Sequence, residues 1–250
     1  MKALLSVVLP ILSAGCGIGT LSLSREEHAR VLESRIHVLA TAPRKRICLR
    51  EHLYRVGSKN LEERHYRYDG LWDPAPELED LVCQALETRF GLKATSVRRT
   101  LDPAGIADPV GSAETAFRDA LESGEESRYL HAPPPEALRA LGSKQIRYLL
   151  EVALTDIVVE RWGLDLGLEP PRYQVVVMAR LIRVLDGEVV WLQEGRDWVR
   201  IPSFDSFIEL QKDAFRPLRE LFPKGVAALC SPENRFLGEF GSFEEGRSRR

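Results

Sequence analysis

The fold is decided by three runs of sequence: YLLEVALTDIVV at 148–159, YQVVVMARLIRVL at 173–185 and EVVWLQEGRDWV at 188–199. The first two are the richest in β-branched and aromatic residues, which favours strands. Asp186-Gly187 separates the last two, and this pair between apolar runs is typical of a β-hairpin because both residues accept positive φ. We therefore expect three consecutive strands that form a meander.

After the third run, from Ser203 to Leu229, the apolar period becomes helical. Ser203 is the expected N-cap, and Asp205 lies in the first turn. Pro217 and Pro223 should kink or divide the helix, since each lacks an N–H and clashes with the carbonyl four residues earlier. The polar face mixes acidic and basic residues, whereas a membrane-surface helix is weighted towards Lys and Arg. The pattern predicts an amphipathic helix that covers the sheet.

The first half of the chain places a second amphipathic helix between strands. RIHVLA at 35–40, RICLR at 46–50 and LKATSVR at 92–98 predict strands. The helix is expected to begin at the N-cap Asp73 and to end at Gly91. We expect an α+β fold: a mixed, mainly antiparallel sheet with the C-terminal three-strand meander, and both amphipathic helices packed on one face.

Composition divides the chain into one domain and its flanks. We expect a signal segment at 1–16, a linker with a short helix at 17–34 whose N-cap is Ser24, a single α+β domain at 35–230 and a flexible tail at 231–250. A Pro/Gly-rich insertion is expected at about 100–144. The formal net charge of −2 gives no reason to expect a nucleic-acid partner.

The N-terminus resembles a bacterial lipoprotein signal. A short basic start and the apolar run ALLSVVLPIL precede Ser13-Ala14-Gly15-Cys16. This resemblance implies that Leu12, Ser13, Ala14 and Gly15 are recognised as the signal. It also implies that Cys16 carries the lipid and becomes the new N-terminus.

The match departs from the commonest form because Ser13 stands where a large aliphatic residue is usual, with Leu12 one position earlier. An ordinary cleaved signal peptide and a cytosolic chain with an apolar first helix remain alternatives. The residue after the cysteine is Gly17 and not an aspartate, which resembles lipoprotein signals that are sorted to the outer membrane. A lipid would anchor the chain at the periplasmic face without spanning the membrane.

Catalytic and metal-binding patterns are absent from the sequence. The five histidines show no H-x3-H or HExxH spacing, and no nucleotide-binding or nucleophile-elbow motif occurs. Cys48, Cys83 and Cys230 lack compact metal spacing and allow three alternative disulfide pairings. Glu151 and Asp156 should lie on opposite faces of their strand, so they do not make a carboxylate pair. We expect a non-enzymatic protein with neither cofactor nor metal.

Four aromatic residues are candidates for contact with a partner. Tyr66 and Tyr68 lie in the polar, aromatic run HYRYDG, which predicts an edge strand, and Trp72 follows it. Trp162 begins a Gly/Pro-rich loop, 162–171, that could act as a flap at the sheet edge.

The run YRYDGLWDPAPELEDLVCQAL at 66–86 resembles the corresponding segment of ABC-type transport auxiliary lipoproteins. In that family, too, a β-meander and a C-terminal amphipathic helix close the domain. The same order resembles small α/β envelope lipoproteins related to curli-assembly and Tol-type N-terminal domains. The likeness covers about two thirds of the chain, and the insertion departs from it. It implies a non-catalytic accessory module of an envelope transport or assembly complex, with protein partners in the envelope. The alternative is a lipid-binding protein or hydrolase with a pocket beside the sheet.

Overall fold

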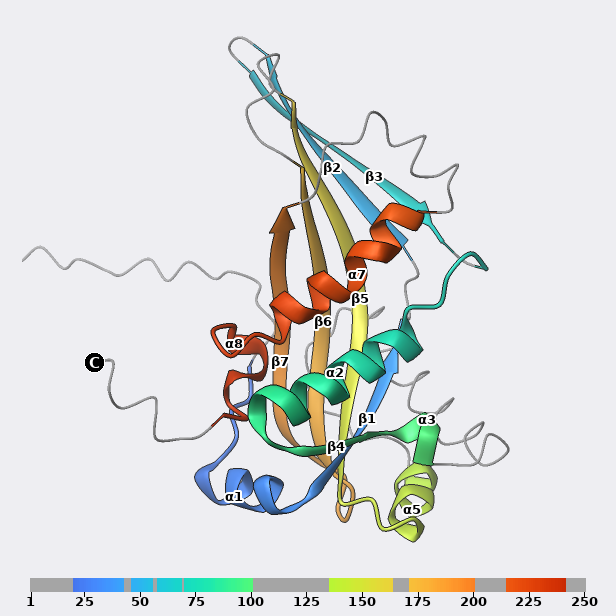
Figure 1. The fold of residues 1–250 in the computed structure, drawn as a ribbon, viewed down its shortest axis with the longest axis vertical. Helices are drawn as coiled ribbons and strands as arrows, with labels where there is room; N and C mark the ends of the chain where they lie inside the picture. Colours follow the sequence, from blue (N-terminus) through green and yellow to red (C-terminus); the bar gives the residue numbers. More distant parts are fainter. Residues whose placement is uncertain are drawn as a thin grey trace, which may run out of the picture.

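The computed structural model describes residues 20–42, 46–55, 58–68, 70–100, 135–163, 171–200 and 215–241. Within these ranges, six helices and seven strands occur, and the strands form one sheet (Figure 1). The elements are α1 (Arg25–Glu33), β1 (Arg35–Thr41), β2 (Arg46–Arg55), β3 (Ser58–Arg67), α2 (Ala75–Phe90), β4 (Lys93–Ser96), α3 (Val97–Thr100), α5 (Pro135–Ser143), β5 (Tyr148–Gly163), β6 (Arg172–Arg183), β7 (Glu188–Arg200), α7 (Arg216–Leu229) and α8 (Arg235–Gly238). The expectation of mixed helices and strands in one sheet is confirmed. None of the described helices is long and apolar enough to cross a membrane.

The long strand β5 is the centre of the sheet. β1 and β2 pair in parallel with successive halves of its one edge, while β6 pairs antiparallel with the other edge and β7 pairs antiparallel with β6. β3 lies antiparallel beside β2, and β4 lies parallel beside β1. Among the described strands, three pairings are parallel and three antiparallel. The sheet is therefore evenly mixed, where the sequence suggested a mainly antiparallel one, because β1 and β2 both run in the direction of β5.

A β-bulge in β5 changes which side chains share a face. Leu154 pairs with Val177 and Asp156 pairs with Val176, so Thr155 is an extra residue. Its hydroxyl donates to the Val176 carbonyl oxygen over 3.0 Å. The expectation that Glu151 and Asp156 lie on opposite faces is wrong, because the extra residue shifts the alternation by one.

Helices α2 and α7 lie side by side over one face of the sheet, which we call the helix face (Figure 1). α7 begins at Arg216 with Pro217 in its first turn, where the missing N–H has no intrahelical partner to lose. The helix continues through Pro223 to Leu229. Pro217 therefore starts the described helix, and Pro223 does not divide it. Ser203 and Asp205, the expected start, lie outside the described residues.

The apolar side of α7 is buried against the sheet, since Leu218 and Phe222 are at most 1% exposed. Leu218→Ala is expected to lower the free energy of unfolding by about 2–5 kcal/mol, the range for emptying a packed core site. Urea unfolding followed by circular dichroism measures this loss. Arg219→Ala, at the exposed neighbouring position, is the control and should stay within about 0.5 kcal/mol of the wild type. An unchanged midpoint for Leu218→Ala would show that this side of the helix is not packed.

Local capping signals are largely as the sequence indicated. The Ser24 hydroxyl accepts from the Glu27 amide over 3.1 Å at the start of α1. Gly91 ends α2 with a φ of 67°, the left-handed conformation that favours glycine. Asp73 was expected as the N-cap of α2; Pro74 holds that position, while Asp73 Oδ1 accepts from the Ala75 amide over 3.2 Å.

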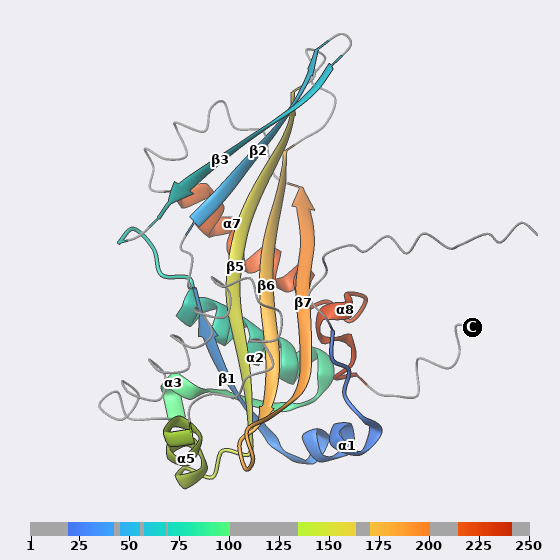
Figure 2. The same cartoon turned by 180° about the vertical axis from the view of Figure 1, so that it is seen from behind.

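Two segments that the sequence assigned to flanking or inserted regions belong to the core. α5 falls inside the expected insertion, yet its Ala137 and Leu141 are buried; Figure 2 shows α5 near one end of the opposite face. At the C-terminus, Phe236 and Phe240 are at most 1% exposed, and both pack against Trp191. The domain therefore continues beyond residue 230, and the part of the tail that is described is packed. Residues 101–134 and 242–250 lie outside the described ranges.

Candidate functional site

The aromatic residues expected to contact a partner divide into buried and accessible ones. Tyr68 is 1% exposed, with its ring centroid 5.4 Å from that of Trp72. Trp72 in turn meets Phe222 of α7 edge-on at 5.0 Å. Tyr68 is therefore packed in the core beside Trp72 and cannot be a contact surface, which corrects the expectation for this residue. Tyr66 and Trp72 are half-buried and keep accessible surface.

The other sequence-based candidates lie at the border of the described residues or outside them. Of Trp162 the structure describes the backbone, which pairs with the backbone of His52 where β5 lies beside β2. Most of the expected flap, residues 164–170, is outside the described ranges. The same is true of Leu12, Ser13, Ala14, Gly15 and Cys16.

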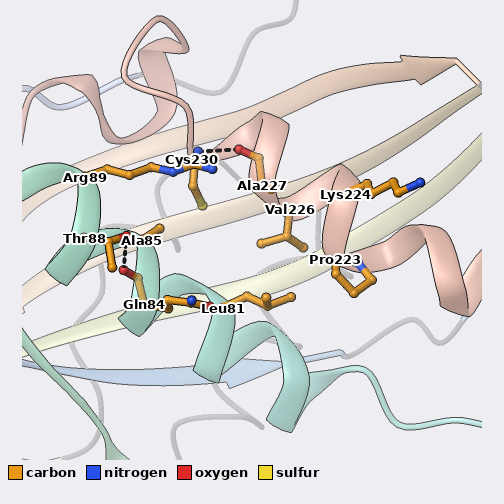
Figure 3. Close-up of a pocket in the computed structure, with 10 residues that line it drawn as sticks. All are labelled: Leu81, Gln84, Ala85, Thr88, Arg89, Pro223, Lys224, Val226, Ala227 and Cys230. Atoms are coloured by element: carbon orange, nitrogen blue, oxygen red, sulfur yellow. Dashed lines mark hydrogen bonds between the residues drawn. The ribbon is translucent and has the colours of Figure 1, made fainter.

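The outer sides of α2 and α7 enclose an apolar groove of about 350 Å³, which we call the helix groove (Figure 3). Leu81 and Ala85 of α2 and Pro223 and Val226 of α7 contribute to its walls. Arg89 lies at one end, where its Nη1 donates to the Ala227 carbonyl oxygen over 2.6 Å. That carbonyl belongs to the last turn of α7 and has no partner within the helix, so Arg89 joins the two helices. The groove offers apolar contact between the helices, and Gln84, Thr88, Arg89 and Lys224 also line it.

The face of the sheet opposite α2 and α7, which we call the open face, carries a second and different depression. It is a cavity of about 190 Å³ lined by β2, β3, β5, β6 and β7, and we call it the polar cavity. Oppositely charged side chains that line the cavity form ion pairs. Arg46 Nε lies 2.8 Å from Asp156 Oδ1, and Arg50 Nε lies 3.2 Å from Glu63 Oε2. The Thr155 bulge puts Asp156 on this face, so sequence alternation alone could not have found the first pair.

The polar cavity also brings Cys48, Glu63 and His65 together. Their ligating atoms all lie within 4.8 Å of one another. No sequence pattern indicates this cluster, because Cys48 and His65 are 17 positions apart and meet only through the register of β2 and β3.

The thiols in the described part of the chain are poor nucleophiles. Burial raises the pKa of Cys48 to about 11 and the pKa values of Cys83 and Cys230 to about 12. Carboxylates near Cys48 and Cys83 add to the shift, since a thiolate there would face like charge. Because the thiolate is the reactive form, all three are unreactive at neutral pH.

A buried ion pair lies on the open face away from the polar cavity. Glu151 of β5 and Arg180 of β6 stand directly opposite each other, and Arg180 Nε donates to Glu151 Oε2. Their side chains are 4% and 1% exposed. Burial raises the pKa of Glu151, and the guanidinium opposes that shift. The bulge places Asp156 on the same face, but it pairs with Arg46, so the two carboxylates do not form an acid–base pair.

Comparison with known proteins gives structural similarity at low identity. No protein-family model matches the chain, and no curated protein matches it either. Among solved structures, the chain is similar to a PelC dodecamer from Paraburkholderia phytofirmans, at 15% identity over 84% of this chain and 90% of that one, with a TM-score of 0.37.

It is also similar to the LpoB C-terminal domain from Salmonella enterica, at 14% identity over 72% of this chain and 96% of that one, with a TM-score of 0.25. Lipoprotein GNA1162 from Neisseria meningitidis is 11% identical over 75% of this chain and 95% of that one, with a TM-score of 0.24. The structural neighbours thus include a bacterial lipoprotein. With TM-scores below 0.5, these similarities carry no argument about activity or partners.

Proposed function

We propose that this chain is a lipid-anchored periplasmic lipoprotein that acts as a non-catalytic interaction module of an envelope transport or assembly complex. The observation that carries the proposal is the apolar run followed by Ser13-Ala14-Gly15-Cys16. A lipid at Cys16 anchors the chain, because acyl chains contribute about 0.8 kcal/mol for each CH2 buried in the bilayer. Gly17 after the cysteine supports the outer membrane as the destination.

The contacts of the first described residues support a short tether. Leu21 exchanges two backbone hydrogen bonds of 3.0 Å with Leu192 of β7. Glu239 then accepts from the Leu23 amide over 3.0 Å and from the Ser22 hydroxyl over 2.7 Å. Five residue steps separate Cys16 from Leu21, which corresponds to a reach of about 17 Å when extended. A lipidated Cys16 would therefore hold the β7 side of the domain close to the bilayer.

The accessible side chains between β3 and α2 support an interaction role. Leu71 is 49% exposed, beside the half-buried Trp72, and Leu61 of the edge strand β3 is 54% exposed. Leu71 and Trp72 thus expose apolar surface beside α2, and Leu61 exposes apolar surface on the face of β3 opposite to Tyr66, which suits contact with an envelope protein. The protonated thiols give no reason to assign hydrolysis to this part of the chain.

Lipidation is tested by metabolic labelling with a fatty acid in the native host. The wild-type chain should incorporate label and fractionate with the outer membrane, whereas Cys16→Ser should incorporate none, because the acceptor sulfur is gone. Cys83→Ser is the matched control and should be labelled like the wild type. Equal labelling of Cys16→Ser and the wild type would exclude Cys16 as the lipid site. Release of the wild type into the soluble periplasm would exclude anchoring.

A further inference from the structure

The edge hairpin of the open face places three different metal-ligating side chains side by side. In the antiparallel ladder of β2 and β3, Cys48 stands directly opposite His65, and Glu63 precedes His65 by two positions. Residues two apart on a strand share a face, and directly opposite residues have Cβ atoms about 4.5–5.5 Å apart. The ladder therefore fixes the three side chains on one face, at the polar cavity.

We propose that Cys48, Glu63 and His65 form a binding site for a divalent transition-metal ion, with Zn²⁺ the best match. The atoms that each can offer lie within 4.8 Å of one another, and Glu63 Oε1 is 3.1 Å from His65 Nε2. In a tetrahedral zinc site with bonds of about 2.0–2.3 Å, ligand atoms are about 3.3–3.7 Å apart. The Glu63–His65 contact already has nearly this spacing, and side-chain rotation brings the sulfur into range.

The donor types select the class of ion. One sulfur, one imidazole nitrogen and one carboxylate oxygen suit zinc and its neighbours, whereas Ca²⁺ and Mg²⁺ require oxygen ligands. Cys48 binds as the thiolate, so the metal displaces its proton. Three protein ligands leave a fourth position open, and the polar cavity of about 190 Å³ has room for a water there.

Arg50 holds the Glu63 carboxylate in place from outside the proposed site. Arg50 Nε lies 3.2 Å from Glu63 Oε2, which holds the carboxylate through one oxygen and leaves Oε1 towards His65. Such outer contacts orient metal ligands in known sites. Their arrangement here follows from the same strand register, since Arg50 stands opposite Glu63.

The arginines that line the polar cavity do not leave it positively charged. Arg46 pairs with Asp156 at 2.8 Å, Arg50 with Glu63 at 3.2 Å and Arg196 with Glu194 at 3.8 Å. Each guanidinium thus has its own carboxylate, so the repulsion of an incoming cation is largely offset. Entry is open, because the side chains of His65 and Glu63 are 45% and 38% exposed. Cys48, by contrast, is 2% exposed, so the sulfur is shielded from oxidants in bulk solvent.

The test is a Co²⁺ titration of the full chain, purified in detergent with a non-chelating reductant. Co²⁺ bound to a thiolate gives a charge-transfer absorption that oxygen and nitrogen ligands do not produce. We expect this absorption to saturate at one ion per chain and to vanish when Zn²⁺ is added. Absence of the thiolate absorption in the wild type would overturn the proposal.

Variants assign the ligands. Cys48→Ser should abolish the absorption, whereas Cys83→Ser, the matched cysteine control, should keep it. His65→Ala and Glu63→Gln alter exposed side chains, and each should weaken Zn²⁺ binding at least ten-fold, as measured by calorimetry. These two variants decide the matter if Cys48→Ser fails to fold by circular dichroism. Wild-type affinity in both, or charge-transfer absorption that survives in Cys48→Ser, would show that the metal binds elsewhere. The site is independent of lipidation, so its failure would leave the proposed anchor untouched.

Discussion

Arg180→Met is expected to lower the free energy of unfolding by about 3–5 kcal/mol, the range for breaking one side of a buried ion pair. Arg180 is 1% exposed and faces Glu151 across β5 and β6. Removing the guanidinium leaves the carboxylate of Glu151 without its ionic partner in a place that already raises its pKa through burial. Methionine keeps most of the side-chain volume, so the loss reports the charge and not a cavity.

The loss should depend on pH. Without Arg180 the pKa of Glu151 rises further in the folded state, while in the unfolded state it stays near about 4.3. The folded variant then binds more protons than the unfolded chain, so its stability falls as pH rises above the unfolded pKa. The loss of unfolding free energy in Arg180→Met relative to the wild type should be smaller at pH 4.5 than at pH 7.5. The stability of the variant falls over this interval of about three pH units.

Two further variants make this result specific to the pair. Glu151→Met combined with Arg180→Met should recover much of the loss, since replacing both charges by apolar groups is often close to neutral. Arg196→Met removes an arginine that is 69% exposed and 3.8 Å from its carboxylate, and it should change stability by less than about 0.5 kcal/mol. Urea unfolding at both pH values measures all of these. If Arg180→Met is no worse than Arg196→Met, the pair does not support the fold.

The elements that local chemistry determines were predictable from the sequence. Ser24 and Gly91 cap helices through their own hydroxyl and their own backbone freedom, and both do so in the structure. Gly187 has a φ of 75°, as a turn between β6 and β7 requires. The connection between these strands nevertheless spans four residues, 184–187, and is longer than Asp-Gly alone.

The features that were missed depend on contacts between distant parts of the chain. Thr155 has no sequence feature that distinguishes it from other strand residues. The bulge arises only where β5 pairs with β6, and there the Thr155 hydroxyl bonds to the Val176 carbonyl oxygen. The meeting of Cys48 and His65 depends on the β2–β3 register, which the hydrophobic pattern of a polar hairpin specifies only weakly. Gly195 of β7 pairs in regular register with Val177, so its missing side chain does not mark a bulge. The absent side chain is needed for packing instead.

That packing concerns α8 and the end of the chain. A Cβ added at Gly195 would lie 2.4 Å from Phe236, so the phenyl ring occupies the space directly above the glycine. The same ring lies 6.2 Å from Trp191, which Phe240 meets edge-on at 5.0 Å. Asn234 holds α8 in place, since its Oδ1 accepts from the Phe236 amide over 2.9 Å. The described part of the expected flexible tail is thus fixed by two aromatic side chains.

Phe236→Ala is therefore expected to lower the free energy of unfolding by about 3–5 kcal/mol, the range for emptying a buried phenylalanine site. Phe236 is fully buried, and its loss removes contacts with both Trp191 and the backbone at Gly195. Urea unfolding measures the loss, and the native tryptophan fluorescence should shift towards that of a more hydrated indole. Arg235→Ala, at the exposed position before it, should stay within about 0.5 kcal/mol of the wild type. If Phe236→Ala is as stable as Arg235→Ala, the chain after residue 230 is a dispensable tail, and Trp191 is covered by other residues. A loss in the expected range makes α8 a part of the domain, because a flexible tail could not contribute that much through one side chain.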